Sequence, residues 1–147
     1  MIMKLDAKQM RYDVFLAGPW EQYAKESYKD RLKSNLPHLK FYDPEIDSGQ
    51  INGTWFEDNY VGIKKSKLLV SHECTFPGAG TTRETGIYYG MYGDGKNPLE
   101  NLVIIFFKDL QPDFGIEVAK KMGIVVYNVT EAENYIKRYF ENNKKIK

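Results

Sequence analysis

The chain has 147 residues, of which 42% are hydrophobic and 28% are charged, so we expect one compact domain with a buried core over residues 1–147. Its 21 basic and 20 acidic residues leave a net charge of +1, which gives no electrostatic reason to expect nucleic acid or an anionic membrane as partner. The single cysteine, Cys74, excludes an internal disulfide, and no run approaches the roughly 20 apolar residues of a membrane span. We expect a soluble, cytoplasmic protein that binds a small molecule.

The first part of the chain predicts a strand, a helix and a second strand. Tyr12–Ala17 is typical of a buried strand and ends at Gly18-Pro19, after which Trp20–Leu36 carries a charged helical pattern. Lys40–Tyr42 predicts a short second strand. The following residues, Asp43–Gly53, are turn formers throughout, so we expect a long acidic loop there.

The middle of the chain predicts a helix, a strand and another helix. Thr54 is placed to cap a helix whose apolar residues recur at helical spacing on one face, namely Phe56, Tyr60 and Ile63. Lys67–His72 predicts the third strand and leads into a loop of small residues. Thr81–Tyr92 then predicts the next helix.

The last third of the chain predicts two strands and two helices. Leu102–Phe107 is continuously apolar, as expected for a central strand that is covered on both faces. A helix at about Gly115–Met122 and a strand at Ile124–Tyr127 follow. Thr130 and Glu133 have the spacing of a capping box, which predicts the start of the final helix.

Strands that alternate with helices five times predict a parallel sheet with helices on both faces, a flavodoxin-like or Rossmann-like α/β fold. The commonest order of five such strands is 2-1-3-4-5, which opens a crevice at the carboxyl ends of strands 1 and 3. Those ends carry Gly18-Pro19 and the glycine-rich stretch Gly78–Gly90. We therefore expect the ligand site where these two loops meet.

Glu84 is the only carboxylate in the stretch Gly78–Gly90. We place it in the first turn of a helix, where the helix dipole favours the ionised form, so it is a candidate nucleophile. The segment Thr81-Thr-Arg-Glu84 also has the spacing of a capping box, in which Glu84 would only reach back to a backbone N–H of its own helix. The local pattern leaves both interpretations open.

Motifs for other chemistry are absent from the sequence. It has no complete Gly-x-x-x-x-Gly-Lys-Ser/Thr phosphate loop, no three-glycine dinucleotide fingerprint after the first strand and no Gly-x-Ser-x-Gly elbow. His38 and His72 share no metal-ligand spacing with each other or with Cys74. We therefore expect neither a metal nor an organic cofactor.

A carboxylate nucleophile suits reactions at an anomeric carbon, where it stabilises an oxocarbenium-like transition state and can form a sugar ester. A second group must then help the leaving group depart. The candidates are Asp43 and Asp58, with Asn59 as a neutral hydrogen-bonding partner. Each aspartate also has an ordinary structural interpretation, since Asp43 precedes a proline in a turn and Asp58 lies in a first helical turn.

Three segments together resemble the nucleoside 2-deoxyribosyltransferase family. They are Val14-Phe-Leu-Ala-Gly-Pro19, Asp58-Asn-Tyr-Val-Gly-Ile63 followed by Ser66-Lys-Leu-Leu-Val70, and Gly80-Thr-Thr-Arg-Glu84-Thr-Gly86. The resemblance implies that Glu84 attacks the anomeric carbon of a 2′-deoxyribonucleoside, and that a second nucleobase or water resolves the resulting ester. It implies that Asn59 holds the nucleophile or the sugar hydroxyls, with Asp58 beside it. The residues expected to line the substrate are Ala17, Gly18, Pro19, Asp43, Gly80 and Thr81.

The sequence departs from the family at Gly78, where the resemblance would place an acid six residues before the nucleophile. This leaves open which group protonates the leaving base. Relatives that hydrolyse deoxynucleoside monophosphates lack the same acid, which favours a nucleotide or hydrolase variant. Arg83 or Lys64 would then meet the phosphate, or each is simply an exposed helix charge.

Two further alternatives stay open. One is a glycohydrolase for another N-riboside, such as NAD or a ribonucleotide, and the other is a nucleotide-binding module without turnover. The family builds its sites at subunit interfaces, so the resemblance also implies a homo-oligomer in which a neighbour completes the pocket.

Overall fold

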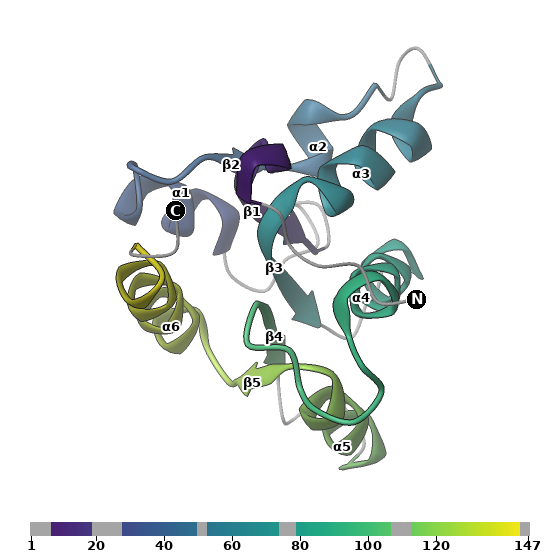
Figure 1. Ribbon diagram of the computed structural model, residues 1–147, viewed down its shortest axis with the longest axis vertical. Coiled ribbons are helices and arrows are strands. Elements are labelled where there is room, and N and C mark those ends of the chain that lie inside the picture. The colour runs from purple at the N-terminus through teal and green to yellow at the C-terminus, as the bar shows by residue number, and fades with distance from the viewer. Residues whose placement is uncertain (1–6, 19–27, 50–52, 74–78, 107–112, 145–147) are drawn as a thin grey trace.

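Five parallel strands form the centre of the molecule, and helices cover both faces of the sheet (Figure 1). The computed structural model describes residues 7–18, 28–49, 53–73, 79–106 and 113–144. The strands are β1 (Tyr12–Ala17), β2 (Phe41–Tyr42), β3 (Ser66–Glu73), β4 (Leu102–Phe106) and β5 (Ile124–Val126). A short 3-10 helix, η1 (Ala7–Gln9), precedes them, and the α-helices are α1 (Tyr28–Asn35), α2 (Pro44–Asp47), α3 (Trp55–Lys64), α4 (Ala79–Tyr92), α5 (Asp113–Met122) and α6 (Val129–Asn142).

The strand order is β2-β1-β3-β4-β5, and every neighbouring pair is parallel. The predicted flavodoxin-like or Rossmann-like fold and its strand order are therefore confirmed. In the register of the central pairs, Val14 lies beside Leu68 and Val70 lies beside Val103. The order reverses between β1 and β3, so the carboxyl ends of these two strands flank the crevice that open α/β sheets use for ligands.

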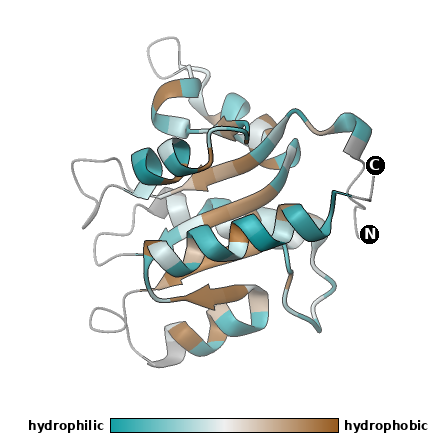
Figure 2. Ribbon diagram, turned by 90° about the vertical axis from the view of Figure 1, so that its left-hand side faces the viewer, coloured by the Kyte–Doolittle hydropathy of each residue, from teal (hydrophilic) through white to brown (hydrophobic). Residues whose placement is uncertain are grey.

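Two hydrophobic cores lie on opposite faces of the sheet. On one face, alternate strand residues such as Val14 and Leu16 pack against α1 and α6. On the other face, Phe15 and Ala17 pack beneath α3, α4 and α5. Figure 2 shows the strands in the hydrophobic colour, with helices that carry hydrophilic residues outside them. Both faces are covered, so the strands are apolar throughout rather than alternating.

The N-cap of the final helix lies two residues before the predicted cap. Asn128 is the N-cap of α6, and its side chain accepts a hydrogen bond from the Glu131 backbone N–H at 2.8 Å. The Glu131 carboxylate accepts from the Tyr127 N–H at 2.7 Å. The predicted Thr130 cap is wrong because Asn is at least as good an N-cap as Thr, and the earlier start buries Val129 completely.

Two predictions for the segment after β2 also differ from the structure. The expected acidic loop contains the short helix α2, which has Pro44 in its first turn and Asp43 as its N-cap. In α3, only Ile63 of the predicted apolar face is buried, whereas Phe56 and Tyr60 are exposed. In the part of the chain that the structure describes, no helix has the length and apolar character needed to cross a bilayer.

Candidate active site

Glu84 lies in the second turn of α4, not in the first turn as predicted. The helix begins at Ala79, so Glu84 is its sixth residue, and Thr81 lies inside the helix rather than at its N-cap. The Thr81 side chain is buried, and its carbonyl accepts a hydrogen bond from the Thr85 hydroxyl at 2.8 Å. The capping-box interpretation of Glu84 is therefore wrong, because the small residues before Thr81 already form helix.

Burial controls the ionisation of the Glu84 carboxyl. It raises the pKa of Glu84 from its ordinary value of 4.5 to about 7, against the opposing effect of the Lys29 charge. The expectation that the helix dipole would favour the ionised form is wrong, because the dipole acts mainly within the first turn. A carboxyl with a pKa near neutrality exists in both protonation states at pH 7, which suits a group that takes part in a reaction.

A phenol and an amide lie beside Glu84. The Tyr42 hydroxyl at the end of β2 donates a hydrogen bond to Asn59 Oδ1 on α3 at 3.0 Å. Burial raises the pKa of Tyr42 above its usual range, and the negative charges of Asp58 and Glu84 add to this effect. All three predicted catalytic residues therefore act on the Tyr42 phenol, Asn59 through a hydrogen bond and Asp58 and Glu84 through their charges.

Asp58 has a structural task in addition to its place in the crevice. Its Oδ2 accepts hydrogen bonds from the Gly49 backbone N–H at 2.8 Å and from the Thr54 hydroxyl at 3.0 Å. Thr54 is the N-cap residue of α3, as predicted, but its side chain binds Asp58 and no backbone N–H. The Asp58 carboxylate therefore holds the segment that leads into α3.

Asp43 is turned into the protein and is almost fully buried. Its Oδ1 pairs with Lys29 Nζ at 2.9 Å, its Oδ2 pairs with Lys33 Nζ at 2.7 Å, and it caps α2 at the Glu45 N–H. Burial alone would raise the pKa of Asp43, but the hydrogen bonds from Lys33 and Lys29 bring it below its ordinary value. The side chain predicted to bind substrate is therefore occupied by these two lysines.

Sequence reasoning missed Lys29, a residue that is 1% exposed. Its positive charge acts on both Glu84 and His72. Burial is the main cause that lowers the pKa of His72 to about 4, and its ring stacks on Tyr28 with centroids 4.5 Å apart. The spacing of Lys29 and Lys33, one helical turn apart, was the available sequence signal.

The end of β1 approaches the crevice mainly through its backbone. The Ala17 side chain is buried in the core, and Gly18 lies where a Cβ atom would overlap the Tyr28 phenol. Gly80 lies in the first turn of α4, while Pro19 and Gly78 fall outside the described residues. The glycine at position 18 is therefore explained by the packing of Tyr28.

The arrangement offers the Glu84 carboxyl and the Asn59 amide to a ligand, while the buried Lys29 ammonium is paired with Asp43. Across the described ranges, no three His, Cys, Asp or Glu side chains gather as they would around a metal ion.

Comparison with known proteins supports the fold. No known family model and no curated protein matches the sequence. A conserved protein from Enterococcus faecalis V583 has a similar solved structure, with a TM-score of 0.59, 15% identity and coverage of 87% of this chain and 98% of that one. The TIR domain of a Toll-related receptor from Hydra magnipapillata is also similar, with a TM-score of 0.58, 11% identity and coverage of 90% and 98%. At such low identity these likenesses show the fold alone.

We expect Gly18→Ala to destabilise the protein by about 1–3 kcal/mol, because the new methyl group must displace Tyr28 from its stack on His72. Urea unfolding measures the effect. The matched control is Gly90→Ala in α4, where a Cβ meets nothing within 4 Å, and it should stabilise by about 0.5–1 kcal/mol. Equal stability of Gly18→Ala and the wild type would contradict this packing role.

Proposed function

We propose that the protein is a nucleoside 2-deoxyribosyltransferase that uses Glu84 as its nucleophile. The observation that carries the proposal is a half-buried carboxyl with a pKa of about 7 at the switch point of the sheet, beside the Tyr42–Asn59 pair. A Glu84 oxygen attacks C1′ of a 2′-deoxyribonucleoside, and the electrons of the N-glycosidic bond leave with the base, which takes up a proton. A nitrogen of a second nucleobase then attacks C1′, loses its proton to solvent and releases the Glu84 carboxylate as the C1′–O bond breaks.

The hydrogen bond between Tyr42 and Asn59 supports the positioning part of this mechanism. Because Asn59 Oδ1 accepts from the Tyr42 hydroxyl, the amide is held with its NH₂ group available as a donor. That group is suited to orient a sugar hydroxyl or the Glu84 carboxylate. Positioning of this kind matters because attack at C1′ requires a near in-line approach of the nucleophile.

The proton for the leaving base comes from outside these residues in our proposal. Tyr42 is a poor acid because burial raises its pKa, and Asp58 Oδ2 already accepts two hydrogen bonds. Solvent or a group of a neighbouring subunit is therefore the proton source. This assignment agrees with Gly78 standing where the resemblance would place an acid.

The second candidate is a deoxynucleoside 5′-monophosphate N-glycosidase, in which water resolves the ester. It is favoured by Gly78, because relatives that hydrolyse deoxynucleoside monophosphates also lack an acid at that position. Arg83 is exposed on α4 and Lys64 is half-buried at the end of α3, so both are secondary candidates for the phosphate.

We also propose that a second copy of the chain packs over α3 and completes the crevice. Large apolar side chains are exposed on α2 and α3; they are Ile46, Trp55, Phe56, Tyr60 and Val61, and the last four flank Asp58 and Asn59 in the sequence. Several exposed apolar residues on one element are typical of a contact surface. A neighbour seated here would lie against the open side of the site.

Glu84→Gln is expected to reduce turnover by about 10³-fold or more, because the amide is not a nucleophile toward C1′. The assay is chromatography of deoxynucleosides and deoxynucleoside monophosphates, each with and without a second free base. A new nucleoside that forms only with that base identifies the transferase, and free base with a released sugar identifies the hydrolase. Turnover only of substrates with a 2′-hydroxyl identifies the riboside glycohydrolase, and binding without product identifies the non-catalytic module.

The free energy of unfolding of Glu84→Gln, measured as a function of pH, distinguishes a loss of catalysis from a loss of folding. The folded-state pKa of Glu84 lies above its ordinary value, so its stabilising contribution is present below about pH 4.5 and is lost as the pH rises through about 7. Between pH 5 and pH 8, the free energy of unfolding of Glu84→Gln should therefore rise by about 1–3 kcal/mol relative to that of the wild type. The matched control is Glu117→Gln at an exposed position of α5. It should keep the turnover of the wild type and the same pH dependence of the free energy of unfolding.

We expect log(kcat/KM) to fall with unit slope below about pH 7, because the nucleophile must be ionised. Lys29→Met should move this limb to higher pH, since the Lys29 charge lowers the pKa of Glu84. Lys33→Met is the matched control, because it removes the other lysine on Asp43. Equal shifts in both variants would show that the limb does not report on Glu84.

Wild-type protein should be a dimer or larger by light scattering at micromolar concentration. Phe56→Glu places a charge on the exposed apolar surface and should yield monomers with reduced turnover, while Glu117→Lys on α5 should leave the assembly unchanged. A monomeric wild-type protein would contradict the proposed assembly.

A further inference from the structure

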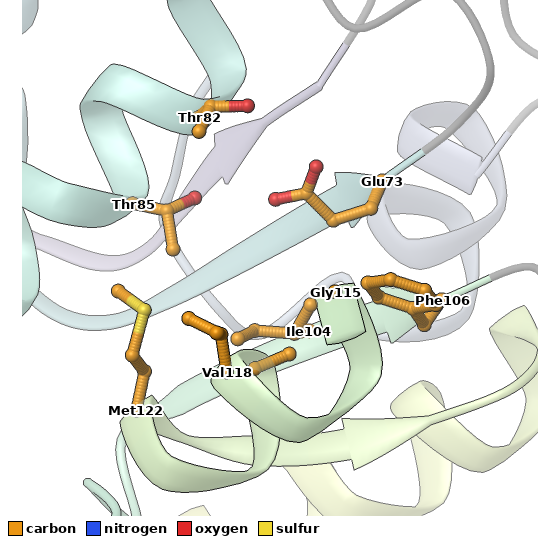
Figure 3. A pocket seen from close by; sticks show the side chains of 9 residues that line it. Glu73, Thr82, Thr85, Ile104, Phe106, Gly115, Val118 and Met122 are labelled. Atoms are coloured by element: carbon orange, nitrogen blue, oxygen red, sulfur yellow. The ribbon is translucent and has the colours of Figure 1, made fainter. Parts of the chain in front are cut away.

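A second pocket opens at the carboxyl edge of the sheet (Figure 3). It has a volume of about 260 Å³ and lies between α4, α5 and the ends of β3 and β4. Glu84 is not among its lining residues. The volume is near the lower end of the range for small-molecule sites.

One side of the pocket is polar and built around Glu73, the last residue of β3. The Ser71 hydroxyl fixes this carboxylate by donating to Glu73 Oε1 at 3.0 Å, and Ser71 Oγ lies 2.8 Å from the Thr85 hydroxyl, whose one proton is shared between Ser71 Oγ and the Thr81 carbonyl. Figure 3 shows the Glu73 carboxylate extending over the pocket toward the side of Thr82 and Thr85. Successive side chains of a strand point to opposite faces of the sheet, so Ser71 and Glu73 lie on the same face, toward the helices α4 and α5.

The Glu73 carboxylate is half-buried and has no cation beside it in the described part of the chain. Burial raises the pKa of Glu73, while the hydrogen bond from Ser71 acts in the opposite direction. A carboxylate in such a position gains most from a ligand that supplies N–H donors, ideally with positive charge. Among the residues that the structure describes, none donates a hydrogen bond to Oε2.

The opposite side of the pocket is apolar. Ile104 and Phe106 come from β4, and Val118 and Met122 come from α5. Val118 is 40% exposed, which places it at the mouth. An apolar wall facing a single fixed carboxylate suits a flat ring with one polar edge better than it suits a sugar or a phosphate.

We propose that this pocket binds a small planar nitrogen heterocycle with two adjacent N–H donors on one edge, of the guanine or 2-amino-azole type. The two N–H groups pair with the Glu73 carboxylate in parallel hydrogen bonds, and the ring lies against Phe106 and Val118. The proposal does not rest on the reaction assigned to Glu84, because Glu84 does not line this pocket. It adds a binding site that the resemblance does not imply.

The test uses 2-aminobenzimidazole as probe and benzimidazole, which lacks the exocyclic amino group, as its matched control. Both are titrated into the full ¹⁵N-labelled chain and followed by amide chemical shifts. We expect 2-aminobenzimidazole to shift the amides of Thr85, Val118 and Met122 and to bind at least about tenfold more tightly than benzimidazole. Glu73→Gln should weaken its binding by about tenfold or more, whereas Glu84→Gln should not.

Equal affinity for the two probes, no saturable shifts up to millimolar concentration, or unchanged binding by Glu73→Gln would overturn the proposal. Because Glu73 is half-buried, the Gln variant could lose its fold. Val118→Trp then decides the question, since the indole at the mouth fills the pocket from an exposed position. A folded Val118→Trp variant that binds 2-aminobenzimidazole as the wild type does would also overturn the proposal.

Discussion

A buried ion pair between α1 and the end of β2 organises the carboxyl edge of this protein. Lys29 joins the first helix to Asp43, and Asp43 in turn caps α2 and accepts Lys33. Removing one partner of a buried pair leaves an uncompensated charge and costs about 3–5 kcal/mol, so the positions of α1, β2 and α2 depend on this contact. The same ammonium acts on Glu84, so one group serves both the architecture and the electrostatics of the site.

Helix α4 divides the carboxyl edge into two chemically different halves. Glu84 and Thr85 are consecutive residues, and consecutive side chains on a helix point about 100° apart, so one faces the crevice and the other faces the second pocket. Each half contains a carboxyl whose pKa is raised by burial, Glu84 in the first and Glu73 in the second. Raised pKa values of buried carboxyls are concentrated at functional sites, which makes both halves candidates for binding or chemistry.

The sheet was predictable from the sequence because its determinants are local. A continuous apolar run such as Leu102–Phe106 indicates a central strand, and the alternation with helices leaves few ways to order the strands. Helix starts were less predictable, since α6 has two candidate caps close together and α4 begins without the expected Thr81 cap. The pairing of Lys29 with Asp43 could not be predicted, because it joins residues 14 positions apart through a contact that only the folded sheet creates.

The protonation of Glu84 illustrates why the site needed the structure. A helix dipole is worth about 0.3–1 kcal/mol within the first turn, whereas a pKa that rises from 4.5 to about 7 corresponds to about 3 kcal/mol in the opposite direction. Burial therefore outweighs the helix dipole, and in the protein without ligand it disfavours the ionised form of Glu84. Positive charge that develops at C1′ of a bound sugar would act on Glu84 as Lys29 does and favour its ionised form. In the proposed reaction, the attraction between the Glu84 carboxylate and C1′ is therefore stronger in the transition state than in the ground state, and only such interactions accelerate a chemical step.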